Sequence, residues 1–159
     1  DNLVFFIDRY VHDHAAAEDI AIDVFTQLVV HKHRYNFQVC LKTYLFMIGR
    51  SRALDYIKHR SKLPVAELSE AAQLPTEEAS LEEMVLADER KRAVNAALAQ
   101  LPEELRVAVH LVYFEELSCD EAARVMKKNR KQVYNLLYRA KSALRTILGE
   151  EGSMLYEKF

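Results

Sequence analysis

Apolar side chains recur every three or four residues over most of the chain, which is the spacing of one face of an α-helix. Such stripes predict helices at residues 3–10, 17–32, 41–60, 77–99, 102–117 and 133–148. The second stripe consists of Ala17, Ile20, Ala21, Val24, Phe25 and Leu28, and the fifth of Val107, Leu111, Val112 and Phe114. The early part of the third segment is apolar on most sides, at Leu41, Tyr44, Leu45, Phe46, Met47 and Ile48, which predicts a central buried helix.

Residues 118–148 have the pattern of two capped helices joined by a tight turn. Ser118 with Glu121, and Asn129 with Gln132, are placed to form capping boxes. The second helix has an apolar stripe made of Val133, Leu136, Leu137, Ala140, Leu144 and Leu148. Its other side carries Arg130, Lys131, Tyr134, Asn135, Tyr138, Arg139, Lys141 and Arg145. This layout is typical of a DNA-reading helix-turn-helix; the alternative is a plain helical hairpin with a solvated basic face.

Composition favours an all-α protein. The 159 residues are half apolar, with only three Gly and three Pro, and strong helix formers dominate. No run of about 18 apolar residues predicts a membrane span, and the first residues, DNLVFFIDRY, lack the basic start of a signal peptide. Cys40 and Cys119 fit no zinc or redox spacing, so we expect free thiols in a cytoplasmic, reducing setting.

Charge is distributed in blocks rather than mixed. Residues 31–62 carry eight bases and one acid, residues 63–89 carry eight acids and no base, and residues 118–148 carry eight bases and two acids. Solvation alone would mix the signs more evenly. Two basic blocks separated by an acidic one predict two contacts with a polyanion.

The first basic block also carries aromatic rings. Tyr35 and Phe37 stand among polar residues at 33–39, where the helical period breaks, and Tyr44 follows them. Rings beside cations suit single-stranded nucleic acid, because unpaired bases stack on rings while cations follow phosphates. The alternative is that each ring is an ordinary core or rim residue.

An enzyme is the least favoured class. No nucleophile, phosphate-binding loop or metal spacing occurs, and the His12/His14 and His31/His33 pairs diverge on a helix. We therefore expect no catalytic residue, no metal and no cofactor.

Three stretches, AEDIAIDVFTQL, TYLFMIGRSRALDYIKHR and LAQLPEELRVAVHLVYFEELSCDEAARVM, resemble in order and spacing an extracytoplasmic-function (ECF) RNA polymerase sigma factor. The resemblance implies two small helical domains joined by an acidic linker. Residues 1–61 would be the region 2 bundle, with an incomplete first helix, and 62–87 the linker. Residues 88–148 would be the region 4 helix-turn-helix and 149–159 a tail.

The resemblance also implies the partners and the site residues. Core polymerase would bind through its largest subunit to Asp19, Asp23 and Gln27, and its second-largest subunit would hold region 4. Region 2 would open the −10 element and hold a flipped base, with candidates Tyr35, Asn36, Phe37, Arg50, Ser51, Lys58, Arg60 and Lys62. Region 4 would read the −35 element through Arg130, Lys131, Tyr134, Asn135, Tyr138 and Arg139. Members of this family are commonly held inactive by an anti-sigma factor.

The chain departs from the family at several positions. Ile22 and Asp23 replace a usual Gln-Glu pair, Tyr44 a frequent Trp, Ser51 a common Asn, and Lys127-Lys128 the usual turn glycine. Two alternatives to a sigma factor stay open: a helix-turn-helix regulator that binds duplex DNA without polymerase, and a helical partner protein that does not bind DNA. The apolar tail residues, such as Phe159, would pack on a partner, fold back on region 4 or fray.

Overall fold

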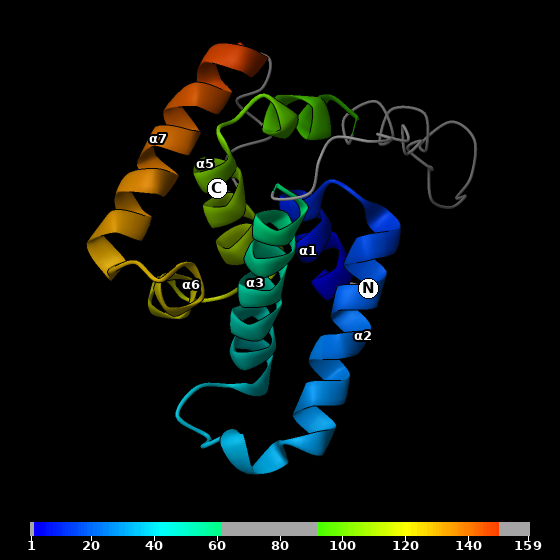
Figure 1. The fold of residues 1–159 in the computed structure, drawn as a ribbon. Helices are drawn as coiled ribbons and strands as arrows, with labels where there is room; N and C mark the ends of the chain where they lie inside the picture. The colour runs from blue at the N-terminus through cyan, green and yellow to red at the C-terminus, as the bar shows by residue number, and fades with distance from the viewer. Residues whose placement is uncertain (1, 62–91, 150–159) are drawn as a thin grey trace, which may run out of the picture.

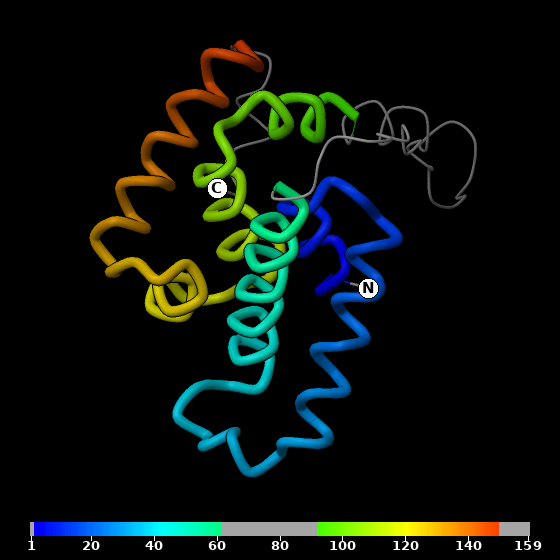
Figure 2. Tube along the Cα trace, in the orientation of Figure 1, coloured from blue at the N-terminus to red at the C-terminus, as the bar shows by residue number. Residues whose placement is uncertain are grey.

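The computed structural model describes residues 2–61 and 92–149, and every regular element in these two ranges is helical. Figure 1 shows the arrangement and Figure 2 the path of the chain. The all-α prediction is confirmed. The predicted linker at 62–87, the tail at 149–159 beyond Gly149, and Lys62 lie outside the described residues.

Three helices form the first bundle. They are α1 (Asn2–Val11), α2 (His14–Val30) and α3 (Leu41–Arg60), and each contacts the other two. Asp13 caps α2 by accepting a hydrogen bond from the Ala16 amide at 3.2 Å, which starts this helix three residues before the predicted Ala17. A Cβ atom on Gly49 would lie 3.0 Å from the Leu3 side chain. The glycine therefore allows α1 to approach α3 closely.

The second group of helices follows residue 91. Residues 92–99 are helical, and α5 (Glu103–Val109) runs into a single π-helical turn, η2 (His110–Phe114). The helix-turn-helix consists of α6 (Cys119–Met126) and α7 (Arg130–Leu148). The π turn replaces the regular helix predicted to continue to residue 117. It turns the polar side chains of His110 and Glu115 into the interior, where they are 5% and 3% exposed.

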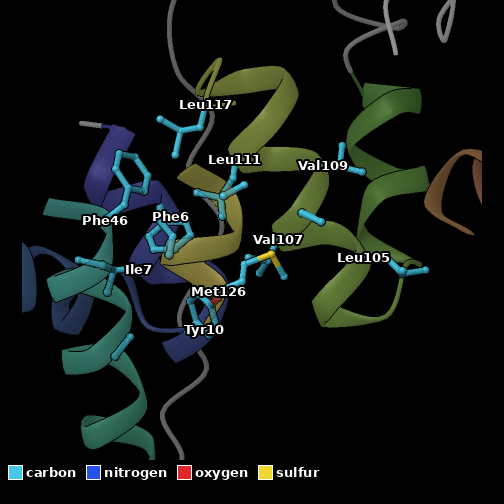
Figure 3. Close-up of a cluster of buried hydrophobic side chains, with 14 of the residues drawn as sticks. Phe6, Ile7, Tyr10, Phe46, Leu105, Val107, Val109, Leu111, Leu117 and Met126 are labelled. Carbon is cyan, nitrogen blue, oxygen red and sulfur yellow. The ribbon is translucent and has the colours of Figure 1, made fainter. Parts of the chain in front are cut away.

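Side chains from both groups meet in one apolar cluster. Figure 3 shows Phe6 and Phe46 of the first bundle together with Leu111 and Leu117 of the second. The rings of Phe6 and Phe46 are 4.8 Å apart, edge to face, and the Phe6 ring stacks with His110 at 6.1 Å. The two groups are therefore packed against each other, which the sequence pattern did not predict.

Several burial predictions are wrong. Phe25 and Phe114 were assigned to the core but are 50% and 46% exposed, and Leu41 is 44% exposed. Only Phe46 among the six apolar residues at 41–48 is buried. The fully buried positions of α3 form one narrow line, namely Thr43, Phe46, Gly49 and Ala53. Leu45, Met47 and Ile48 lie beside this line and are only partly buried against the core.

Candidate nucleic-acid interface

The turn between α6 and α7 has the predicted capping chemistry. Ser118 accepts a hydrogen bond from the Glu121 amide at 3.2 Å, and the Glu121 carboxylate accepts from the Ser118 amide at 3.0 Å. Asn129 and Gln132 form the same reciprocal pair at 2.8 Å each. Lys127 ends α6 with a φ of 53°, so this lysine takes the left-handed conformation usual for glycine.

The outer face of α7 presents the predicted polar and aromatic side chains. Val133, Leu136, Ala140 and Leu144 are buried, which confirms most of the apolar stripe. All six predicted −35 residues are exposed: Arg130, Lys131, Tyr134, Asn135, Tyr138 and Arg139. The Arg130 guanidinium lies 5.5 Å from the centre of the Tyr134 ring and donates to its hydroxyl at 3.2 Å. The face is therefore accessible to solvent and cationic, and the contact between Arg130 and Tyr134 holds two of its side chains together.

The loop between α2 and α3 holds an aromatic cluster. It begins with the 3-10 helix η1 (Lys32–Arg34). The Tyr35 ring lies 4.6 Å from Phe37 and 5.0 Å from Tyr44 of α3. The Tyr35 hydroxyl donates to the Val39 carbonyl at 2.8 Å, and the Gln38 amide donates to the Asn36 side chain at 3.2 Å. These bonds fix the loop and leave Phe37 83% exposed with a φ of 59°.

The other −10 candidates do not gather in one place. Ser51 lies on a groove of about 360 Å³ together with Tyr44 and Arg52, and Arg52 donates to Gln27 at 2.9 Å. Arg50 points elsewhere, toward Tyr10. Burial raises the pKa of Tyr10 to about 12, and the nearby Arg50 charge offsets part of this rise.

Two further candidates, Lys58 and Arg60, lie near the C-terminal end of α3. At a rise of 1.5 Å per residue, they lie roughly 25 Å along α3 from its start. Arg60 pairs with Asp13 at 3.5 Å. Sequence reasoning weighed Tyr44 with the other rings but did not include it or Arg52 among the −10 candidates, although Tyr44 stands one helical turn from the loop.

On α2, Asp19 and Asp23 are exposed as predicted, whereas Gln27 is half-buried against Arg52. The same helix exposes a larger apolar stripe: Ile22 is 63%, Phe25 50% and Val29 73% exposed. The three residues are spaced at i, i+3 and i+7, so they share one face. An exposed apolar stripe beside acids is typical of a protein-binding surface. The spacing was visible in the sequence, but Phe25 was assigned to the core.

Among residues 2–61 and 92–149, no group of three or more His, Cys, Asp or Glu side chains is placed to hold a metal ion. Cys40 and Cys119 are free thiols. Within the same residues, none of the helices is both long enough and apolar enough to cross a membrane.

Comparisons with known proteins cover both halves of the chain. Residues 2–63 match Sigma-70 region 2 and residues 91–144 match Sigma-70, region 4. The RNA polymerase sigma-H factor of Pseudomonas aeruginosa is 30% identical over 146 residues, which cover 87% of this chain and 76% of that protein. The ECF RNA polymerase sigma factor SigM of Bacillus subtilis is 24% identical over 149 residues, which cover 89% and 85%.

A solved structure has the same fold. It is the sigma factor RpoE in complex with the anti-sigma factor NepR from Bartonella quintana, with a TM-score of 0.70 at 22% identity, covering 93% of this chain and 90% of that chain. The resemblance identified from the sequence is thus confirmed in both halves and in their order. The chain belongs to the sigma-70 family of RNA polymerase sigma factors, as a transcription initiation factor of the ECF type.

Proposed function

We propose that α7 reads the −35 promoter element in the major groove, and that Tyr134, Asn135, Tyr138 and Arg139 face the bases. The single observation that carries this proposal is the exposed polar face of α7 directly after the capped turn, because a major groove about 12 Å wide admits one such helix. An Asn side chain forms two hydrogen bonds to adenine. Arg130 and Lys131, at the helix start, neutralise phosphates.

The aromatic loop is proposed to receive a base of the opened −10 element. Phe37 is the most exposed ring of the cluster, and Tyr35 and Tyr44 support it from behind. Base stacking on a ring contributes roughly 1–3 kcal/mol per base, which offsets part of the cost of unstacking. Asn36 in the loop and Ser51, about two helical turns beyond Tyr44 on α3, are the polar candidates for contacts to base edges. Lys58, Arg60 and Lys62 contact phosphates, and Arg50 supports the fold through Tyr10.

The exposed face of α2 is proposed as the docking surface for the largest subunit of core polymerase. Ile22, Phe25 and Val29 supply an apolar centre, and Asp19 and Asp23 a charged rim, the usual anatomy of a protein interface. Gln27 contributes to this surface through Arg52, which it already binds. Region 4 in turn contacts the second-largest subunit.

The proposed domain boundaries are those of the sequence: region 2 at 1–61, linker at 62–87, region 4 at 88–148 and tail at 149–159. The linker acids imitate nucleic acid inside the polymerase cleft. The chain works in the cytoplasm, where the polymerase is, and without catalytic residues of its own. The solved structure of similar fold is bound to an anti-sigma factor, which supports the proposal that this chain also binds an anti-sigma factor.

The test is run-off transcription by core polymerase plus this chain on a promoter library, with the start regions sequenced. Asn135→Ala is expected to relax the −35 preference, at a cost of roughly 1–3 kcal/mol at one base position. Phe37→Ala is expected to lower open-complex formation without changing that preference. Thr146→Ala is the matched control, since Thr146 is exposed on α7 roughly 16 Å beyond Asn135.

Failure to start from any promoter in the library contradicts the proposed site as a whole. Tight duplex binding by the chain alone, with no effect of added polymerase, favours the helix-turn-helix regulator instead. An unchanged −35 preference in the Asn135→Ala variant removes that residue from base reading.

A further inference from the structure

A cavity of about 740 Å³ lies between α1 and the segment around α5. Its walls come from α1, from residues 95–99 and from residues 106–115, which include the π turn. Sites for small organic ligands usually have volumes of roughly 300–1,000 Å³. Neither the outer face of α7 nor the aromatic loop before α3 lines this cavity. It therefore has room for a small molecule and no role in the proposed function.

Two arginines line the cavity, Arg9 of α1 and Arg106 of α5. Both are partly exposed, and among the described residues neither forms an ion pair or a hydrogen bond with an acidic side chain. Burial and the charge of Arg106 lower the pKa of Arg9. The charges of Asp8 and Glu115 oppose this shift without reversing it. Since a guanidinium stays charged in proteins, two positive charges repel each other at one cavity.

The two acids on the cavity wall have other neighbours. Glu115 is 3% exposed, and its Oε2 atom lies 3.0 Å from the Lys42 ammonium and accepts a hydrogen bond from the Asn2 side chain at 3.2 Å. Asp8 lies 3.9 Å from Nδ1 of His14. The carboxylates therefore do not pair with the arginines, and an anion that enters the cavity meets guanidinium groups that are available for binding.

The wall also contains buried polar atoms without a protein partner. The His110 side chain is 5% exposed, and its ring stacks with Phe6 at 6.1 Å and Phe114 at 5.8 Å. Its Nε2 atom is 3.3 Å from Oε1 of Glu115, but outside hydrogen-bond geometry. Neither ring nitrogen of His110, nor Nε of Arg106, has a hydrogen-bond partner among the described protein groups. Most buried polar groups do have one, so this wall is suited to polar contents.

The rest of the lining is partly aromatic and apolar. Phe5 of α1 is 52% exposed and Phe114 of the π turn is 46% exposed, and both line the cavity together with Leu98. Exposed aromatic rings favour a planar partner, because offset stacking adds to the gain from burial. The cavity thus combines a cationic part with an aromatic part, which suits a ligand that has an anionic group and a planar body.

Phosphate fits the cationic part better than a single carboxylate. Each guanidinium presents a planar fork of N–H donors that binds phosphate oxygens in pairs. A phosphate monoester carries roughly −1.5 to −2 charge at pH 7, which matches two arginines, whereas a carboxylate carries one charge. Binding of a phosphate would also offset the repulsion that lowers the pKa of Arg9.

We propose that this cavity binds a phosphorylated small molecule with a planar body, of the class of the nucleoside phosphates. Arg9 and Arg106 bind the phosphate oxygens. The rings of Phe5 and Phe114 contact the planar body. The inference rests on the cavity alone and is independent of promoter reading.

The test measures the binding of ADP, adenosine and pyrophosphate to the full chain by isothermal titration calorimetry. The variants are Arg9→Gln, Arg106→Gln and Phe5→Ala. Arg92→Gln is the matched control, because it removes the same charge from an exposed arginine of the helix at 92–99 that does not line the cavity. DNA and polymerase are left out, so a negative result does not bear on the proposed function.

We expect ADP to bind at one site and pyrophosphate to compete for it. Arg9→Gln and Arg106→Gln should each weaken ADP binding about tenfold or more, because each removes charge-assisted hydrogen bonds. Adenosine, which lacks the phosphate, should bind at least about tenfold more weakly than ADP for the same reason. Phe5→Ala should weaken ADP binding about tenfold and leave pyrophosphate binding within about twofold, since only the nucleoside stacks on the ring.

Thermal unfolding without ligand separates a binding role from a structural one. Arg9→Gln should unfold at the same temperature as the unaltered chain or at a higher one, because it removes the repulsion from Arg106. A lower unfolding temperature would show that Arg9 holds the fold together and would remove it from the site.

The absence of ADP and pyrophosphate binding to the unaltered chain overturns the proposal, since the cavity then holds water only. An equal loss in Arg92→Gln also overturns it, because the binding is then to diffuse surface charge. Pyrophosphate binding that is as tight as ADP binding overturns the contact with a planar body, and adenosine binding that is as tight as ADP binding overturns the phosphate site.

Discussion

Lys127 is the residue at which the helix-turn-helix departs most clearly from ideal backbone chemistry. Its φ of 53° forces a side chain into the left-handed region, at a cost of roughly 1 kcal/mol relative to glycine. The sequence predicted this strain, because the turn lacked a glycine.

Lys127→Gly is therefore expected to raise the free energy of unfolding by roughly 0.5–1 kcal/mol, measured by urea denaturation. Lys127→Ala is the control and should give no such gain, since alanine keeps the Cβ atom; equal stability of both variants would refute the strain.

Single residues also show where sequence reasoning fails. The capping residues Ser118 and Asn129 were predicted because their hydrogen bonds are local, within three residues of the cap. Phe25 and Phe114 were misassigned because an apolar stripe shows which side is apolar, not whether another element covers it. Lys42 and Glu115 gave no local signal, since their pairing joins positions 73 residues apart.

At the scale of elements, α2 has two faces with different tasks. Its inner face packs Ala17, Ile20 and Val24 against α1 and α3, while its outer face exposes Ile22 and Val29. The inner face follows from periodicity. The outer face, in contrast, is apolar without a covering element among the described residues, which supports the proposal that it docks on a partner.

Ile22→Asp is the variant that tests the outer face. It is expected to weaken binding to core polymerase by about tenfold or more, since a charge replaces apolar contact at the centre of an interface. Stability should change little, because Ile22 is 63% exposed. Binding is measured by competition with a labelled sigma factor, and Glu18→Gln on the same helix serves as the control. Equal affinity of Ile22→Asp and the unaltered chain would place the docking surface elsewhere.

At the scale of the whole molecule, acid is expected to loosen the packing between the two regions. Burial, with the nearby Arg9 charge, lowers the pKa of His110 below 6.5, and the neutral imidazole stacks on Phe6. Hydrogen bonds from Ser118 lower the pKa of Glu121 to about 2. Both folded-state pKa values lie below the unfolded ones. The stability that depends on these two groups is therefore complete above about pH 6.5. As the pH falls below about 6.5, the part that depends on neutral His110 is lost first, and the part that depends on ionised Glu121 is lost between about pH 4.5 and 2.

Near-ultraviolet circular dichroism and denaturant midpoints between pH 7 and 3 measure this loss. His110→Phe should remove the part of the pH dependence that starts near 6.5, because phenylalanine keeps a ring against Phe6 without a titrating group. A midpoint that stays constant from pH 7 to 5 in the unaltered chain would contradict the role of His110.

The sequence by itself determined the helical fold, the two capped helices, the strained turn and the order of the charge blocks. These features depend on periodicity and on contacts within a few residues, which a linear pattern contains. Its motifs also identified the family, which the comparisons confirmed in both halves.

Only the tertiary structure decided how region 2 and region 4 meet. The π turn at His110–Phe114, the burial of Glu115 and its pairing with Lys42 come from packing between distant segments. Such long-range pairs are selected by the shape and charge of whole surfaces, which no local period encodes. The sequence thus predicted two DNA-binding faces, and the structure decided that the outer face of α7 is exposed while α6 packs against α3.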